Sequence, residues 1–471
     1  MSTTLQPKTP ATKARQDIAE DFARITVGTR FEDIDEASRD RAKQSIMDTI
    51  GVMIAASSLT PKVRAITDLT LEMSGREEAS ILGFGGKVPA LNAAFVNGAM
   101  AHCLDFDDHA PEGHHPSSSI VPATFALAER RGTLSGKEMI AATAIGHDMF
   151  LRIRRNVTWK QDWHLTTIVG VFSAAAAAAR VMGLNHAQTV SALGIAGNQA
   201  SGTMELAYGT GSELRGMYAG FVSKQATLAA LMAERDIVGP GSMLEGPAGF
   251  FQTYLDGVYD RNGILAGLGQ DFTGHAVQFK AWPSCGLTHS YIHAMARLMA
   301  ERNLTPNDIE KIVVHVGDFQ ERLCTPIEDR RAPKVPVDAK FSIPYCVAVA
   351  AVRGTVGLAD FTEDALTNPE VLAVAEKITA QPDPSGNWAA RLPFGRITVT
   401  TNDGQTFEQI GDNVPGESEA PMDWTYIEQK FREAVSFSIN PVPADRVDRA
   451  VALIRDLENA DDATEIMRLL T

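Results

Sequence analysis

The sequence predicts a mainly helical protein that carries a smaller α+β unit. Residues 16–275 are dominated by alanine- and glycine-rich segments with helical spacing of apolar residues, such as "TTIVGVFSAAAAAARVMGLN". Later in the chain, "IEKIVVHVGD" alternates and is rich in β-branched residues, as a strand should be. The run "GRITVTTNDGQTFEQI" contains two further strand-like segments around Asn402-Asp403-Gly404, a strong hairpin signal.

These patterns divide the chain into four parts. Residues 1–15 are polar and are predicted to form a disordered tail. Residues 16–275 form a helical domain, and residues 276–411 form an α+β lid domain. Residues 412–471 are again helical but too short for a domain, so we expect them to pack back on the first one. The segment "GDNVPGESEAPMD" is the predicted crossing between the two domains.

Composition excludes several classes of partner. The net charge of −15 argues against binding to nucleic acid or to an anionic membrane. The longest small-apolar run, "VGVFSAAAAAARVMG", is too short to span a bilayer and contains an arginine. The four cysteines form no CxxC pair and the first residues resemble no secretory signal, so a reducing, cytoplasmic location is expected.

The stretch "LDFDDHAPEGHHPSSS" gathers three carboxylates and three imidazoles after a predicted helix. Its spacing places His102 and Asp105 on one helical face. Three interpretations remain open for this stretch: an ordinary polar loop with capping residues, a metal site, and a metal-free acid–base site. The HxxxH and HExxH spacings typical of helical metal sites are absent, which favours the acid–base interpretation.

Four further residues lie in polar clusters, and each also has a purely structural interpretation. His164 precedes an alanine-rich helix, where it could serve only as a cap. Arg215 lies in the glycine-rich run "GTGSELRGMYAG", where it could point to solvent or bind a substrate carboxylate. Cys285 and His289 in "FKAWPSCGLTHSYIH" could form a nucleophilic pair or an inert domain-junction turn.

Taken together, these stretches resemble the MmgE/PrpD family over nearly the full length of the chain. The most specific piece is "AHCLDFDDHAPEGHHPSSS", followed by "WHLTTIVGVFSAAAAAARVMGL", "GSELRGMYAGF", "FKAWPSCGLTH" and "AKFSIPYCVAVAA". The resemblance implies a homodimer with a large helical domain, a smaller α+β lid and an active site between them. It also implies no metal or organic cofactor, and activities such as 2-methylcitrate dehydration, cis-aconitate decarboxylation and iminodisuccinate epimerisation.

The resemblance also implies which side chains form the site. The catalytic set is Asp105, His115, His164 and Lys280, and the substrate-binding set is His109, Arg215, Cys285 and Tyr345. Three of these depart from the family pattern: Arg215 replaces a lysine, Cys285 a histidine of decarboxylase-like members, and His109 a threonine. Arginine keeps the charge but cannot give up a proton, which weighs against cis-aconitate decarboxylation.

We therefore predict a cofactor-independent enzyme that acts on a small di- or tricarboxylate by proton transfer at a carbon α to a carboxylate. His115 and His164 form the predicted acid–base pair, and Asp105 orients an imidazole. Arg215 and Lys280 stabilise the developing negative charge. A 2-methylcitrate dehydratase-like hydro-lyase ranks first and an epimerase second. A metal-dependent hydrolase and a non-catalytic helical binding protein are the rivals from other classes. Asp107, Asp108 and His114 are interpreted as loop scaffolding.

Overall fold

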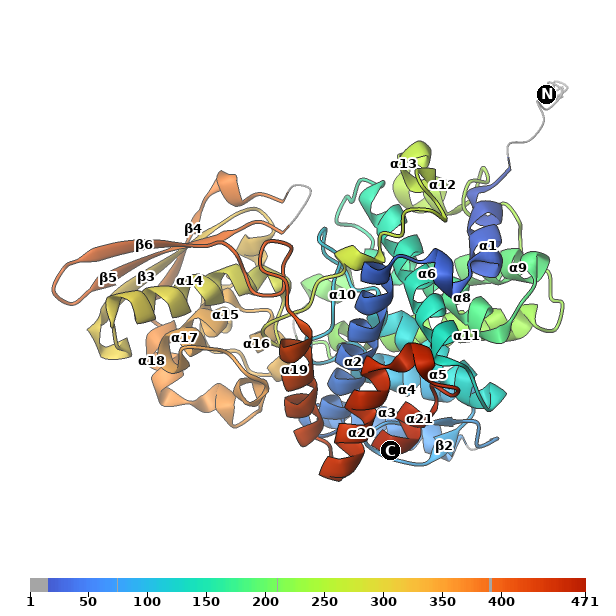
Figure 1. Ribbon diagram of the computed structural model, residues 1–471. Helices are drawn as coiled ribbons and strands as arrows, with labels where there is room; N and C mark the ends of the chain where they lie inside the picture. Colours follow the sequence, from blue (N-terminus) through green and yellow to red (C-terminus); the bar gives the residue numbers. More distant parts are fainter. Residues whose placement is uncertain (1–15, 74, 210, 389–391) are drawn as a thin grey trace, which may run out of the picture.

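The computed structural model describes residues 16–73, 75–209, 211–388 and 392–471, and helices dominate it (Figure 1). The strands gather mainly in one four-stranded sheet, which lies at the far end of the molecule from the N-terminal helices. The predicted fold class, mainly helical with a smaller α+β unit, is confirmed. The tail predicted for residues 1–15 lies outside the described residues.

The helical unit is built from thirteen described helices and a short two-stranded hairpin. Their bounds are α1 Ile18–Gly28, α2 Glu36–Leu59, α3 Pro61–Glu72, β1 Ala79–Ser80, β2 Lys87–Val88, α4 Ala90–His102, α5 Ser117–Arg131, α6 Gly136–Arg155, α7 Leu165–Ile168, α8 Gly170–Met182, α9 His186–Gly197, α10 Glu205–Tyr208, α11 Leu214–Ala233, α12 Phe250–Leu255 and α13 Arg261–Leu265. The hairpin was not predicted, because two-residue strands leave no alternating pattern in the sequence.

Small residues bring the central helices of this unit close together. α4 packs against α11, and a Cβ added at Gly98 would lie 2.9 Å from the Cα of Gly220. Only glycine permits this approach, since real Cβ contacts are almost never that short. The alanine-rich segment Leu165–Met182 has the length and apolarity of a membrane span, but 94% of it is buried inside the protein. It therefore serves as a core element of the bundle.

The α+β unit follows. Its bounds are α14 Gly286–Arg302, β3 Ile309–Val316, α15 Ile327–Arg331, α16 Pro336–Lys340, α17 Ile343–Arg353, α18 Pro369–Ala375, β4 Ile378–Pro382, β5 Gly395–Thr401 and β6 Thr406–Gly411. The strand order is β4-β3-β5-β6, with β4 parallel to β3 and the other pairs antiparallel. The predicted strands at 309–318 and 395–410 are confirmed. β4 was missed, because only its first residue is buried and it shows no alternation.

One face of the sheet is buried by helices. In β5 every second residue is buried, and Ile397 and Val399 lie opposite Val314 and Ile312 of β3. α14 packs across β5 and β6, and α17 packs against α14 (Figure 1). The alternating pattern that predicted the strands is therefore the signature of this half-buried sheet.

The last helices return to the helical unit. They are α19 Trp424–Ser436, α20 Ala444–Arg455 and α21 Glu465–Leu470, and α19 packs along α2 (Figure 1). The two segments that cross between the units lie side by side. The backbone N–H of Phe279 in the first donates to the carbonyl of Gly416 in the second at 3.4 Å. Lys430 of α19 then donates to the carbonyls of Phe106 and Lys280 at 2.7 and 3.1 Å. The C-terminal helices thus support the loop that carries the polar cluster.

Candidate active site

A cavity between the two units collects most of the predicted site residues. Its empty volume is about 790 Å³, counting the part that opens to solvent. The predicted residues that line it are Asp105, His109, His115, His164, Arg215, Lys280 and Cys285. Eight polar or aromatic residues outside the predicted set also line it: His102, His114, Trp159, Thr166, Tyr218, Phe319, Phe341 and Trp388.

The polar loop after α4 turns sharply, which changes the geometry that the sequence suggested. α4 ends at His102, and the chain reverses at Asp105, whose φ of 51° lies in the left-handed region. The backbone N–H of Asp105 donates to the carbonyl of His102 at 2.7 Å. The expectation that His102 and Asp105 share a helical face is therefore wrong, because the helix stops before Asp105.

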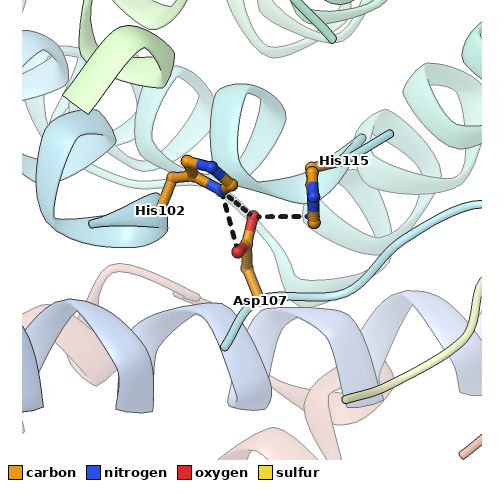
Figure 2. A group of neighbouring side chains, drawn as sticks. All are labelled: His102, Asp107 and His115. Carbon is orange, nitrogen blue, oxygen red and sulfur yellow. Dashed lines mark hydrogen bonds and ion pairs between the residues drawn. The ribbon is translucent and has the colours of Figure 1, made fainter. Parts of the chain in front are cut away.

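Asp107 lies between two imidazoles (Figure 2). His102 Nδ1 donates to both of its carboxylate oxygens at 2.9 and 3.0 Å, and His115 Nδ1 lies 3.3 Å from Oδ2. Burial alone would raise the pKa of Asp107, but the two histidines hold it well below its usual value. Asp107 is thus more than the loop scaffolding we predicted. It holds the imidazoles, a role that the sequence analysis gave to Asp105.

The tautomer of His115 follows from its second contact. Its Nδ1 also lies 2.7 Å from the backbone carbonyl of Asp108, and a carbonyl can only accept a hydrogen bond. In the neutral ring the proton is therefore on Nδ1, and Nε2 carries the lone pair. His115 is held in the form that a general base requires.

The carbonyl that holds His115 is itself fixed by a buried network. The Asp108 carboxyl accepts hydrogen bonds from the hydroxyls of Ser45 and Ser117 at 2.7 and 2.5 Å. Ser117 Oγ also lies 2.7 Å from Nε2 of His147. Burial raises the pKa of Asp108 to about 7. Asp108 acts as scaffolding, as predicted from the sequence, and its scaffolding role is to position the general base.

Lys280 and Asp105 form a buried ion pair on the cavity wall. Lys280 Nζ donates to the Asp105 carboxylate and to its backbone carbonyl, the latter at 3.0 Å. Burial would raise the pKa of Asp105, but the Lys280 ammonium and nearby imidazoles lower it to about 2. Asp105 Oδ2 has no hydrogen-bond partner within the described residues, so this carboxylate keeps one free acceptor at the cavity.

Arg215 brings a buried cation that has no carboxylate partner among the residues that the structure describes. It is only 7% exposed, and its Nε and Nη1 donate no hydrogen bond to any described residue. The guanidinium lies over the ring of Phe341, 3.4 Å from the ring centre. Burial lowers the pKa of Arg215 to about 10. A protein rarely leaves such a group unsatisfied, and a ligand carboxylate would satisfy it with two parallel hydrogen bonds.

Three further imidazoles line the cavity in the neutral form. Burial lowers the pKa of His109 and of His164 to about 3, and it holds that of His114 well below its usual value. His114 Nδ1 accepts a hydrogen bond from Arg154 Nε at 3.1 Å, so its Nε2 carries the proton. His164 Nδ1 has no partner among the described residues. His114 therefore belongs to the site, whereas the sequence analysis had treated it as scaffolding.

Cys285 and Tyr345 differ in where the structure places them. Cys285 lines the cavity, and burial raises the pKa of its thiol to about 11, so it is no thiolate nucleophile at neutral pH. Tyr345 lies outside the cavity, contrary to the prediction: it is 1% exposed, and its hydroxyl donates to the carbonyl of Asp360 at 2.8 Å. The missed tyrosine is Tyr218, whose ring centre lies 4.4 Å from those of both His102 and His164.

His102, Asp107 and His115 form a cluster that could hold a metal ion by proximity, because their donor atoms lie within 4.8 Å of one another. Their geometry is that of a hydrogen-bonded cluster. His115 Nδ1 acts as a donor, since it also lies 2.7 Å from the backbone carbonyl of Asp108, and His102 Nδ1 lies 2.9 Å from the Asp107 carboxylate itself. A metal ligand must instead present a lone pair. These residues therefore fit an acid–base role better than a metal.

Comparison with known proteins shows the family of this chain. The MmgE/PrpD N-terminal domain matches residues 20–261, and the MmgE/PrpD C-terminal domain matches residues 282–456. The chain belongs to the MmgE/PrpD family. A human cis-aconitate decarboxylase is 26% identical over 96% of this chain and 94% of its own length. A cis-aconitate decarboxylase of Aspergillus terreus is 27% identical over 93% of each chain. The 2-methylcitrate dehydratase of Escherichia coli is 24% identical over 81% and 82%. Similarity to these enzymes supports an enzymatic role for this chain.

Proposed function

We propose that this MmgE/PrpD protein is a cofactor-independent enzyme that moves a proton at a carbon α to a carboxylate, as a hydro-lyase of the 2-methylcitrate dehydratase type. The observation that carries the proposal is one cavity with both an oriented base and a buried free cation. His115 presents Nε2 as the lone-pair nitrogen, and Arg215 presents two donors that have no partner among the described residues. Proton abstraction next to a carboxylate needs these two elements.

The roles follow from the contacts. Arg215 binds a substrate carboxylate and Lys280 stabilises the negative charge that develops on it. His115 Nε2 takes the α proton, the electron pair forms the carbon–carbon double bond, and the hydroxyl leaves as water with a proton from an acid. His164 is the proposed acid, since bound carboxylates raise the pKa of a nearby imidazole toward its usual value. Asp107 stabilises the protonated form of His115.

The test measures alkene formation by ultraviolet absorbance from a panel of hydroxy di- and tricarboxylates that includes 2-methylcitrate and citrate. His115→Gln should reduce kcat by about a hundredfold or more, because general acid–base catalysis contributes that much. His186→Gln is the matched control, since His186 is 46% exposed and does not line the cavity. Full turnover by the His115 variant would contradict the proposal.

Decarboxylation is the second candidate, because two cis-aconitate decarboxylases are similar to this chain over 96% and 93% of its length. Epimerisation is the third, since the cavity holds imidazoles on several segments that could serve as acid and base on opposite faces of one carbon. The products separate the three reactions: carbon dioxide release from cis-aconitate, water loss with alkene formation, or deuterium exchange without loss of any group.

We also propose a homodimer in a cytoplasmic, reducing environment that binds a small carboxylate and neither nucleic acid nor membrane. The four cysteines are all free thiols, and three of them are buried, which supports a reducing environment. Light scattering coupled to size-exclusion chromatography tests the dimer directly, and a monomer at micromolar concentration would overturn it.

A further inference from the structure

One wall of the cavity is aromatic. The rings of Trp159, Phe319 and Trp388 lie within contact of one another, with centres 5.5 to 5.8 Å apart. Trp159 comes from the helical unit, and the other two come from the α+β unit. Further apolar side chains extend this wall: Met204, Leu206, Leu323, Phe341 and Leu392. A citrate-like molecule has little apolar surface to place against it.

The aromatic wall packs against the loop that carries the general base, residues 103–116. Trp159 donates its indole N–H to the carbonyl of Trp163 at 2.9 Å, and its ring meets that of His114 edge-on at 4.7 Å. Trp388 lies against Gly113, where an added Cβ would come within 3.1 Å of the indole. Gly113 has a φ of 76°, so both its conformation and its neighbour disfavour a side chain there. The wall thus packs against the loop that carries the general base.

The charges on the cavity wall also argue against a tricarboxylate substrate. Among the described lining residues, the ionised side chains are Arg215, Lys280 and Asp105. Lys280 is already paired with Asp105, which leaves Arg215 as the cation without a carboxylate. The imidazoles of His109 and His164 are neutral in the empty cavity, because burial depresses their pKa. In the empty cavity, three substrate carboxylates would outnumber the lysine and arginine cations that line it.

We infer that the substrate is a hydroxy acid with one or two carboxylates and an apolar substituent larger than methyl, aromatic or branched, that packs against Trp159, Phe319 and Trp388. This inference rests on the proposed function, since it places a carboxylate on Arg215 and the α carbon at His115. The inferred substrate class differs from that of the proposed function: mono- or dicarboxylates with an apolar arm take the place of tricarboxylates.

The test compares the binding of four probes by calorimetry: succinate, 2-phenylsuccinate, citrate and cis-aconitate. Because a buried phenyl ring removes substantial apolar area from water, 2-phenylsuccinate should bind at least about tenfold more tightly than succinate. It should also bind more tightly than both tricarboxylates. Equal binding of the two succinates, or tighter binding of citrate or cis-aconitate, would overturn the inference.

Variants separate this inference from the proposed function. Trp159→Ala and Phe319→Ala should each remove most of the phenyl advantage while leaving the succinate affinity within about twofold. Phe407→Ala is the matched control, because Phe407 is a half-buried aromatic of the same α+β unit outside the cavity. If both alanine variants keep the phenyl advantage, the aromatic wall is not the binding surface and the inference fails.

Arg215→Met distinguishes the two failures. The apolar arm alone would be rejected by two results together: Arg215→Met loses all carboxylate binding, and the native enzyme binds the two succinates equally. If Arg215→Met binds 2-phenylsuccinate as tightly as the native enzyme does, Arg215 does not bind the carboxylate. The proposed function is then rejected as well. The comparison of ligands on the native enzyme does not depend on whether any variant folds.

Discussion

Replacing Arg215 by methionine should make the unliganded protein more stable while it abolishes carboxylate binding. Methionine keeps an unbranched apolar stem of similar length, so the packing over Phe341 is largely retained. The substitution removes a charge that is 7% exposed and whose Nε and Nη1 donate to no described residue. An unsatisfied buried cation in an anion-binding site lowers the free energy of unfolding of the unliganded protein. Its removal should therefore raise that free energy.

The size of the effect can be worked out from the guanidinium. Burial lowers the pKa of Arg215 from 12.5 to about 10, which corresponds to roughly 3 kcal/mol of disfavoured charge at 1.36 kcal/mol per pKa unit. The lost cation–π contact offsets about 1 to 2 kcal/mol of this gain. A net increase of about 1 to 2 kcal/mol in the free energy of unfolding is therefore expected. Loss of a bidentate contact to a carboxylate, at about 1.5–3 kcal/mol per hydrogen bond, should lower kcat/KM by about two to four orders of magnitude.

Urea unfolding of the unliganded variant, with an unchanged m value, measures the first effect, and steady-state kinetics measures the second. Arg330→Met is the matched control: Arg330 is 5% exposed, but its guanidinium donates to the carbonyls of Thr325 and Phe341. It should lose stability, because carbonyls are left without donors. A less stable Arg215→Met that still binds carboxylates would refute the reasoning.

Four other predictions test separate parts of the site. Asp107→Asn should lower kcat about a hundredfold or more without unfolding the protein, because the carboxylate no longer stabilises the protonated His115; unchanged kcat would reject that role. Lys280→Met should cost about 3 to 5 kcal/mol of stability by leaving Asp105 buried and unpaired, and adding Asp105→Asn should restore most of it, as measured by urea unfolding. Burial lowers the pKa of His289 to about 3, so its contribution to stability is present above pH 6.5 and is lost as the pH falls toward 3. His289→Phe should therefore flatten the fall in unfolding free energy between pH 6.5 and 4.5 by about 2 to 3 kcal/mol, and an unchanged slope would count against the assignment. Treatment with EDTA should leave turnover intact, whereas stoichiometric metal whose removal abolishes activity would revive the hydrolase alternative.

The sequence predicts the fold class well because the signals are local. Alanine-rich helical periodicity and the alternating runs at residues 309–318 and 395–410 reflect burial on one face of each element. Seven of the eight candidates that the family resemblance implied line one cavity.

Roles within the cavity depend on long-range geometry, which spacing does not reveal. Asp107 takes the part expected of Asp105, because the chain reverses at Asp105 and turns its carboxylate toward Lys280. Tyr345 begins a buried helix and satisfies its hydroxyl within the α+β unit, so it never reaches the cavity. The aromatic wall joins Trp159 to Trp388, residues more than two hundred positions apart, and no local pattern connects them.

Deuterium exchange at the α carbon tests the central claim most directly. The native enzyme is incubated in D₂O with each of a panel of carboxylates, and proton NMR follows loss of the α-proton signal. The account predicts exchange of at least one α proton, slowed about a hundredfold or more in His115→Gln and unchanged in His186→Gln. Exchange at the native rate in folded His115→Gln would contradict it.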